Sequence, residues 1–125
     1  NLAIRMSLEE WKRVIDINLT STFLLSKFAI KKMLKNKSGK IVNIATDAAR
    51  VGQEREANYS AAKGGVIAFT KSLAKEVGRH NINVNVVSPG ATNSPMRIGL
   101  QEMERFIQHF YPSDSVPSRP RGRAC

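Results

Sequence analysis

Two short β-branched segments constrain the fold of this chain more than any other feature. Residues 40–46 read KIVNIAT and residues 82–88 read INVNVVS, and each is bounded by turn signals. Such short apolar runs are typical of strands that are covered on both faces in a parallel sheet. A helical pattern occupies residues 57–79 between them. The order predicts an α/β fold built around a right-handed crossover unit.

A long helix is predicted before the first strand. Ser7 and Glu10 have the spacing of a capping box, and the helical pattern runs from there to about Asn36. Its apolar residues cover more than one stripe, so we expect both sides to be buried, one on a sheet and one on a partner. A further short helix is expected over residues 95–110, whereas residues 112–125 show no periodicity and are expected to form a disordered or aberrant tail.

Composition narrows the classes of function. The chain has 125 residues, the size of one domain, and its 42% hydrophobic content can form a core. No apolar run approaches the roughly 18 residues of a membrane span, and the first residues lack the layout of a secretory signal. The single cysteine, Cys125, provides neither a disulfide framework nor a set of metal ligands. We therefore expect a cytoplasmic protein without a metal site.

The net charge of +10 raises the possibility of nucleic-acid binding. Its distribution argues against it, because aromatic residues make up only 6% of the chain and do not alternate with basic ones. Arg119, Arg121 and Arg123 lie in the tail. Six lysines gather near the end of the first predicted helix, where cations suit the helix dipole: Lys27, Lys31, Lys32, Lys35, Lys37 and Lys40.

The segment ANYSAAKGG places two polar groups of complementary chemistry on one helix. Tyr59 and Lys63 are separated by one helical turn and project from the same face. A nearby ammonium favours the phenolate over the phenol, which suits a tyrosine that exchanges protons with a substrate. Thr46, at the carboxyl end of the first strand, can add a hydroxyl, because ligands bind at that edge of parallel sheets. The second strand ends at the same edge.

These segments together resemble the short-chain dehydrogenase/reductases. The resemblance rests on GKIVNIAT, on NYSAAKGGVIAFTKSLAKEV and on INVNVVSPG, and it covers roughly residues 8–96. It implies hydride transfer between NAD or NADP and a small alcohol or carbonyl substrate. It also implies a Rossmann-like, doubly wound parallel sheet, of which residues 1–111 would be the catalytic half.

The resemblance assigns roles to individual residues. Tyr59 matches the general acid/base, and Lys63 matches the lysine that assists it and holds the nicotinamide ribose. Thr46 stands where the family usually has a serine that orients the carbonyl. Asn18 matches an asparagine that interrupts the first helix and holds a water in a proton relay.

Four further residues match the nicotinamide side of the cofactor site. Pro89 and Gly90 match the turn beside the ring. Ser94 falls where many members have a threonine that contacts the carboxamide, and Thr92 is a nearby substitute.

The rest of the family pattern is not found. The sequence contains no G-x-x-x-G-x-G element for the pyrophosphate, so the N-terminal cofactor-binding half is expected to be missing. A sheet of two strands is also too small to stand alone. The resemblance implies a homodimer or homotetramer formed through residues 8–36 and 57–79. An inactive fragment that serves only as a dimerisation or interaction module is the alternative.

Within the family, the ATDAARVG loop is similar to enzymes that act on 3-oxoacyl or 3-hydroxyacyl thioesters. The positive charge of the chain would suit the anionic carriers of such substrates.

Overall fold

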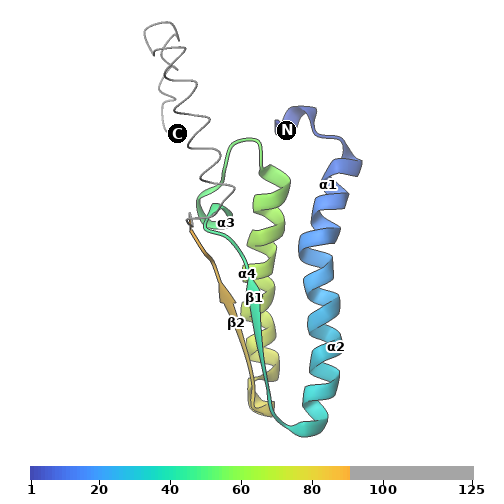
Figure 1. Ribbon diagram of the computed structural model, residues 1–125, viewed down its shortest axis with the longest axis vertical. Helices are drawn as coiled ribbons and strands as arrows, with labels where there is room; N and C mark the ends of the chain where they lie inside the picture. The colour runs from blue at the N-terminus through green and yellow to red at the C-terminus, as the bar shows by residue number, and fades with distance from the viewer. Residues whose placement is uncertain (91–125) are drawn as a thin grey trace, which may run out of the picture. The chain divides into compact units, whose positions relative to one another are not determined.

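The computed structural model describes residues 1–90 (Figure 1). The positions expected to contain a further helix (95–110), the tail (112–125), Thr92 and Ser94 lie outside the described residues. The described elements are a 3-10 turn (Ala3–Arg5), α1 (Leu8–Ile15), a π-helical turn (Asp16–Thr20), α2 (Ser21–Asn36), β1 (Gly39–Ile44), α3 (Ala48–Val51), α4 (Ala57–Val77), a second 3-10 turn (Gly78–His80) and β2 (Ile82–Val87).

The two strands form a parallel pair. Ile41 lies opposite Val84, and the pairing runs from Gly39 with Ile82 to Ile44 with Val87. α4 connects the strands and returns antiparallel to them, so its first turns lie at the carboxyl ends of both strands (Figure 1). The α/β class and the predicted order of helix, strand, helix and strand are confirmed.

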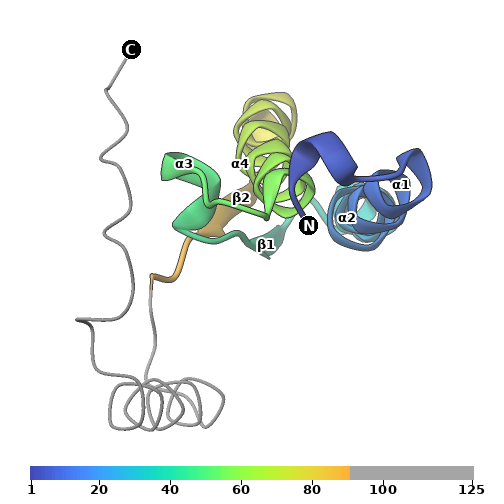
Figure 2. The same cartoon turned by 90° about the horizontal axis from the view of Figure 1, so that it is seen from above.

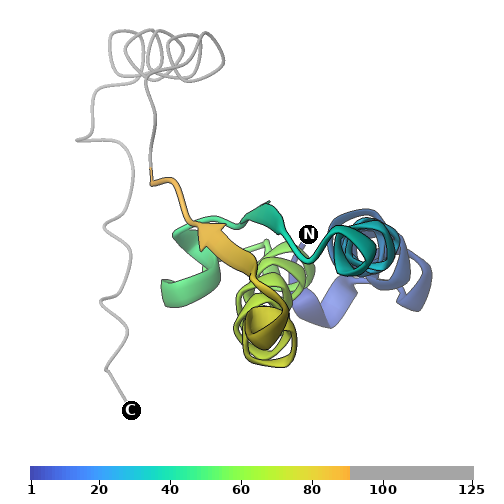
Figure 3. The ribbon, with the colours of Figure 1, turned by 90° about the horizontal axis from the view of Figure 1, so that it is seen from below.

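The core lies between the sheet and two helices. Ile82 and Val84 of β2 are buried together with Ile30 of α2 and Val77 of α4. Seen from above, α2 and α4 stand beside each other next to the strands (Figure 2), and the view from below shows the same arrangement (Figure 3). The alternation of buried and exposed residues along β2 follows from the two-residue period of a strand.

The expectation that the first strand is covered on both faces is wrong for residues 1–90. Val42 is 58% exposed and Ile44 is 53% exposed, because both point away from the helices that cover the other face. The β-branched run therefore predicts the strand correctly. It does not predict the burial of both faces, because no helix within residues 1–90 covers the outer face of β1.

The first helix has the predicted extent, from Leu8 to Asn36, but it is not one continuous α-helix. The π-helical turn separates α1 from α2. The capping box is confirmed, because the Ser7 hydroxyl accepts from the Glu10 N–H at 3.1 Å while the Ser7 N–H donates to the Glu10 carboxylate at 2.8 Å. The expected second buried side is not covered within residues 1–90, where Leu25 is 71% and Phe28 62% exposed.

The capping box predicts a specific pH dependence. The backbone N–H of Ser7, and secondly the side chain of Asn1, hold the pKa of Glu10 below its ordinary value. A lowered carboxyl pKa stabilises the fold above the unfolded value of about 4.3, and this contribution is lost as the pH falls through the lowered value. We expect the unfolding temperature of the parent to fall more between pH 7 and pH 3 than that of Glu10→Gln, which accepts the same hydrogen bond without titrating. Equal losses would contradict this role.

Candidate active site

The carboxyl ends of β1 and β2 remain paired beyond the strands themselves. The Ala45 N–H donates to the Val87 carbonyl at 2.8 Å, and the Asp47 N–H donates to the Pro89 carbonyl at 3.1 Å. These bonds bring Thr46 and the Pro89–Gly90 turn to the same edge of the sheet. Thr46 is half-buried there. The structure thus places side by side two segments that are more than 40 residues apart in the sequence.

Tyr59 and Lys63 lie on the first two turns of α4, at the same edge. The Lys63 Nζ lies 5.9 Å from the centre of the Tyr59 ring, which is a cation–π distance. The same Nζ donates to the Ile44 carbonyl, the last of β1, at 2.9 Å. The ammonium is therefore held between the end of the strand and the tyrosine ring. Both side chains are only half-buried, so a ligand at this edge can reach them.

A buried polar pair fixes α4 on β1 beneath this edge. The Asn43 Nδ2 donates to the Thr70 Oγ1 at 2.9 Å, and the Thr70 hydroxyl donates to the Val66 carbonyl at 2.7 Å. Asn43 is 8% exposed and Thr70 2%. Residue patterns alone do not predict this pair. Its signal was a polar residue at an inward position of a strand, together with a threonine seven residues after Lys63 on the same helix face.

Asn18 lies in the π-helical turn, as the resemblance implied when it placed a helix interruption there. A π-helical turn lengthens the backbone bonding pattern, which leaves carbonyls without their usual partners. The Asn18 Nδ2 donates to the Val14 carbonyl at 3.0 Å, and the Thr22 hydroxyl donates to the Asn18 carbonyl at 3.0 Å. The Ser21 hydroxyl donates to the Ile17 carbonyl. All three bonds join a side chain to the carbonyl four residues earlier, and the helical pattern of NLTST does not predict them.

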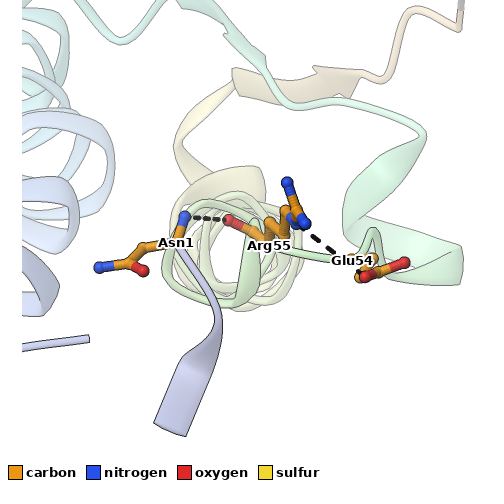
Figure 4. Close-up of polar contacts among 3 residues, drawn as sticks. All are labelled: Asn1, Glu54 and Arg55. Atoms are coloured by element: carbon orange, nitrogen blue, oxygen red, sulfur yellow. Dashed lines mark hydrogen bonds and ion pairs between the residues drawn. The ribbon is translucent and has the colours of Figure 1, made fainter. Parts of the chain in front are cut away.

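The turn that leads into α4 is held from the N-terminal side. The amino group of Asn1 donates to the Arg55 carbonyl at 3.0 Å, and the Arg55 side chain lies 4.0 Å from the Glu54 carboxylate (Figure 4). Arg55 adopts a left-handed conformation with φ of 69°. The Asn58 side chain then accepts from the Tyr59 N–H at 2.9 Å. The first turn of the helix that carries Tyr59 thus has a side-chain partner in Asn58.

Residues 1–90 contain no group of three or more histidine, cysteine or acidic residues that could hold a metal ion. None of the helices in this range is both long and apolar enough to cross a membrane.

Comparison with known proteins identifies the family. The model of the short chain dehydrogenase family matches residues 2–105. The chain belongs to the short-chain dehydrogenase family. Family membership explains why a tyrosine and a lysine one turn apart meet the ends of two parallel strands, and it confirms the resemblance in the sequence.

Several relatives in the family are reductases. The chain is 48% identical over 108 residues to the 3-oxoacyl-[acyl-carrier-protein] reductase of Synechocystis, covering 85% of this chain and 44% of that protein. It is 48% identical over 124 residues to FabG, the 3-oxoacyl-[acyl-carrier-protein] reductase of Chlamydia pneumoniae, covering 99% and 47%. It is 50% identical over 98 residues to the acetoacetyl-CoA reductase of Acinetobacter, covering 78% and 40%. The chain thus spans less than half of the length of these relatives.

The short-chain dehydrogenase site was predicted from eight residues, and the described structure contains six. It brings Tyr59 and Lys63 together, and it places Thr46, Pro89 and Gly90 at the same sheet edge. Asn18 lies in the π-helical turn that packs on α4. The roles of all eight stay predictions.

The buried polar pair provides a test of how the site is supported. Thr70→Val should lower the free energy of unfolding by about 1–3 kcal/mol, because the Asn43 amide loses its partner in a buried place. Thr70→Ser keeps the hydroxyl and should retain most of that hydrogen-bond energy. Denaturant unfolding of both variants measures the difference. A valine variant as stable as the parent would show that the hydrogen bond contributes nothing, because valine keeps the size of threonine.

Proposed function

We propose that this segment is the catalytic part of an NAD- or NADP-dependent oxidoreductase that interconverts a carbonyl compound and its alcohol. The observation that carries the proposal is the placement of the Lys63 ammonium 5.9 Å from the Tyr59 ring while it is bonded to the last carbonyl of β1. A phenol and an ammonium held at the ligand-binding edge of a parallel sheet suit proton transfer to a carbonyl oxygen.

The residues of this chain account for the proton in the proposed reduction. Tyr59 donates its phenolic proton to the carbonyl oxygen, which becomes the hydroxyl oxygen of the alcohol. Lys63 stabilises the phenolate that remains, because an opposite charge nearby favours the ionised form. Thr46 donates a hydrogen bond to the same substrate oxygen and keeps it oriented. In the direction of oxidation, the Tyr59 phenolate takes the proton back.

The donor set of the site fits the nicotinamide riboside end of the cofactor. An ammonium has three N–H donors, and the Ile44 carbonyl takes one of those of Lys63. The remaining donors suit ribose hydroxyls, and the Pro89–Gly90 turn at the same edge offers backbone groups without bulky side chains. When bound, NAD(P)H supplies the hydride that is added to the carbonyl carbon.

We propose 3-oxoacyl thioesters as the substrate class. This proposal is supported by the names of the relatives, which include reductases for 3-oxoacyl-[acyl-carrier-protein] and for acetoacetyl-CoA. The net charge of +10 is compatible with the anionic carriers of such thioesters.

The tyrosine provides the decisive test. In the protein as its source cells make it, Tyr59→Phe should lower the rate of hydride transfer to a 3-oxoacyl thioester by about 100-fold or more, because general acid catalysis is lost. Ser72→Ala serves as the matched control, since it also removes one hydroxyl from α4 but at an exposed position far from the sheet edge, and it should keep the activity of the parent. NAD(P)H oxidation is followed by absorbance, and unfolding curves establish that the fold is unchanged. Full activity of the phenylalanine variant would refute the proposed role.

We also propose that the protein assembles as a homodimer or homotetramer through α2 and α4. An apolar groove lies between these helices and is lined by Phe23, Ile30, Phe69 and Leu73, with lysines at its border. The Phe23 and Phe69 rings meet edge to face at 6.0 Å. Because both helices contribute to the groove, a second copy can cover it with the same two helices, as twofold symmetry requires.

Adjacent residues on α2 offer a matched test of the assembly. Phe23 and Leu24 are each 44% exposed, but only Phe23 lines the groove. Phe23→Ser should shift the protein toward the monomer, whereas Leu24→Ser should leave the assembly unchanged, because only the first removes apolar area from the interface. Light scattering after gel filtration measures the mass. A parent that is monomeric, or equal masses for both variants, would refute this interface.

A pairing function without catalysis is the second candidate, and the exposed apolar groove is the observation that favours it. Such a module would assemble in the test above while remaining inactive in the Tyr59 experiment. Hydride transfer by the parent would exclude it.

A further inference from the structure

The π-helical turn contacts α4 at Gly65, where a side chain would fit only if Leu19 shifted. A Cβ atom built on Gly65 would lie 2.7 Å from Cδ2 and 3.2 Å from Cδ1 of Leu19. Real Cβ atoms essentially never approach another heavy atom as closely as the first of these distances. The neighbouring Gly64 differs, because its Cβ would meet only the Ala49 carbonyl oxygen at an ordinary 3.6 Å. Of these two adjacent glycines, only Gly65 could not gain a Cβ unless the Leu19 side chain or the turn that carries it shifted.

This contact lies between two parts of the candidate active site. On the helix side, Gly65 follows Lys63 by two residues. On the other side, Leu19 directly follows Asn18 and belongs to the same π-helical turn. A shift at the contact between Gly65 and Leu19 therefore changes the position of the turn relative to the helix that carries Tyr59 and Lys63.

The turn itself is stiffened by its own side chains. The carbonyls of Val14, Ile17 and Asn18 accept hydrogen bonds from the side chains of Asn18, Ser21 and Thr22 respectively. These bonds tie residues 14, 17 and 18 to residues 18, 21 and 22 of the same stretch. Because Leu19 directly follows Asn18, a displacement of Leu19 also displaces Asn18.

We propose that Gly65 is a positioning residue, whose missing side chain allows the π-helical turn, and Asn18 with it, to seat against the helix that carries Tyr59 and Lys63. The expected effect on catalysis rests on the proposed hydride transfer. The packing of the π-helical turn on α4 does not depend on that proposal. The competing outcome is that Leu19 changes its rotamer and absorbs an added methyl group without moving the turn.

Hydrogen exchange distinguishes these outcomes without any assay of activity. The experiment compares Gly65→Ala with Gly64→Ala in the protein as its source cells make it. The two variants are matched, because each replaces one glycine of α4 with alanine. Amides of residues 14–22 should exchange about tenfold faster in Gly65→Ala than in Gly64→Ala, because the π-helical turn no longer packs closely on α4. Equal exchange in the two variants would overturn the proposal.

A double-mutant cycle identifies the contact responsible. Leu19→Ala removes the two methyl groups that a Cβ on Gly65 would meet. In the Leu19→Ala background, Gly65→Ala should cause no further change in exchange, because residues that act through one contact are not additive. An undiminished effect of Gly65→Ala in that background would overturn the assignment to Leu19.

The kinetic comparison connects the seating to catalysis. Gly65→Ala should lower kcat by about ten- to a hundredfold, as expected of a misplaced catalytic group, with the KM for NAD(P)H within about twofold of the parent. Gly64→Ala should keep the kcat of the parent. An unchanged kcat alongside faster exchange would overturn the catalytic part of the proposal. A parent without hydride transfer would refute the proposed function, and the exchange comparison would still decide the seating.

Discussion

The packing of α4 on the two parallel strands is the constraint on which the other features depend. Ala62 and Val66 are fully buried, and Thr70 and Val77 continue the same stripe toward the C-terminal end of the helix. Because α4 runs antiparallel to β1 and β2, burial of this stripe brings the N-terminal turns of the helix to the carboxyl ends of the strands. The position of Tyr59 and Lys63 at the carboxyl ends of the strands is thus a geometric consequence of how the core packs.

Two polar links refine this packing along β1. Asn43 donates to Thr70 inside the interface, while Lys63 donates to the carbonyl of the next strand residue, Ile44. An apolar interface tolerates sliding, since dispersion and burial are not directional, whereas the buried bond between Asn43 and Thr70 favours one register of helix and strand. The ammonium of Lys63 therefore has a structural partner in the strand as well as the ring of Tyr59 beside it.

Two groups of apolar residues are exposed on the described part of the chain. Val42, Ile44 and Val87 face away from α2 and α4, and the groove between those helices is lined by aromatic and aliphatic side chains. Contiguous apolar surface of this kind is unusual on a finished soluble domain. The outer strand face suits the second helical layer of a doubly wound sheet, and the groove suits a second copy of the chain.

Much of the secondary structure could be predicted from local patterns alone. The capping box at Ser7 and Glu10, both strands and the helix with Tyr59 and Lys63 one turn apart follow from side-chain periodicity, which is a property of neighbouring residues. Tertiary structure decided what periodicity cannot express. It determined that Asn43 meets Thr70 and that the Leu19 side chain lies against Gly65, where a Cβ would come within 2.7 Å of it. Both features are contacts between residues far apart in the sequence, so only the packed chain defines them.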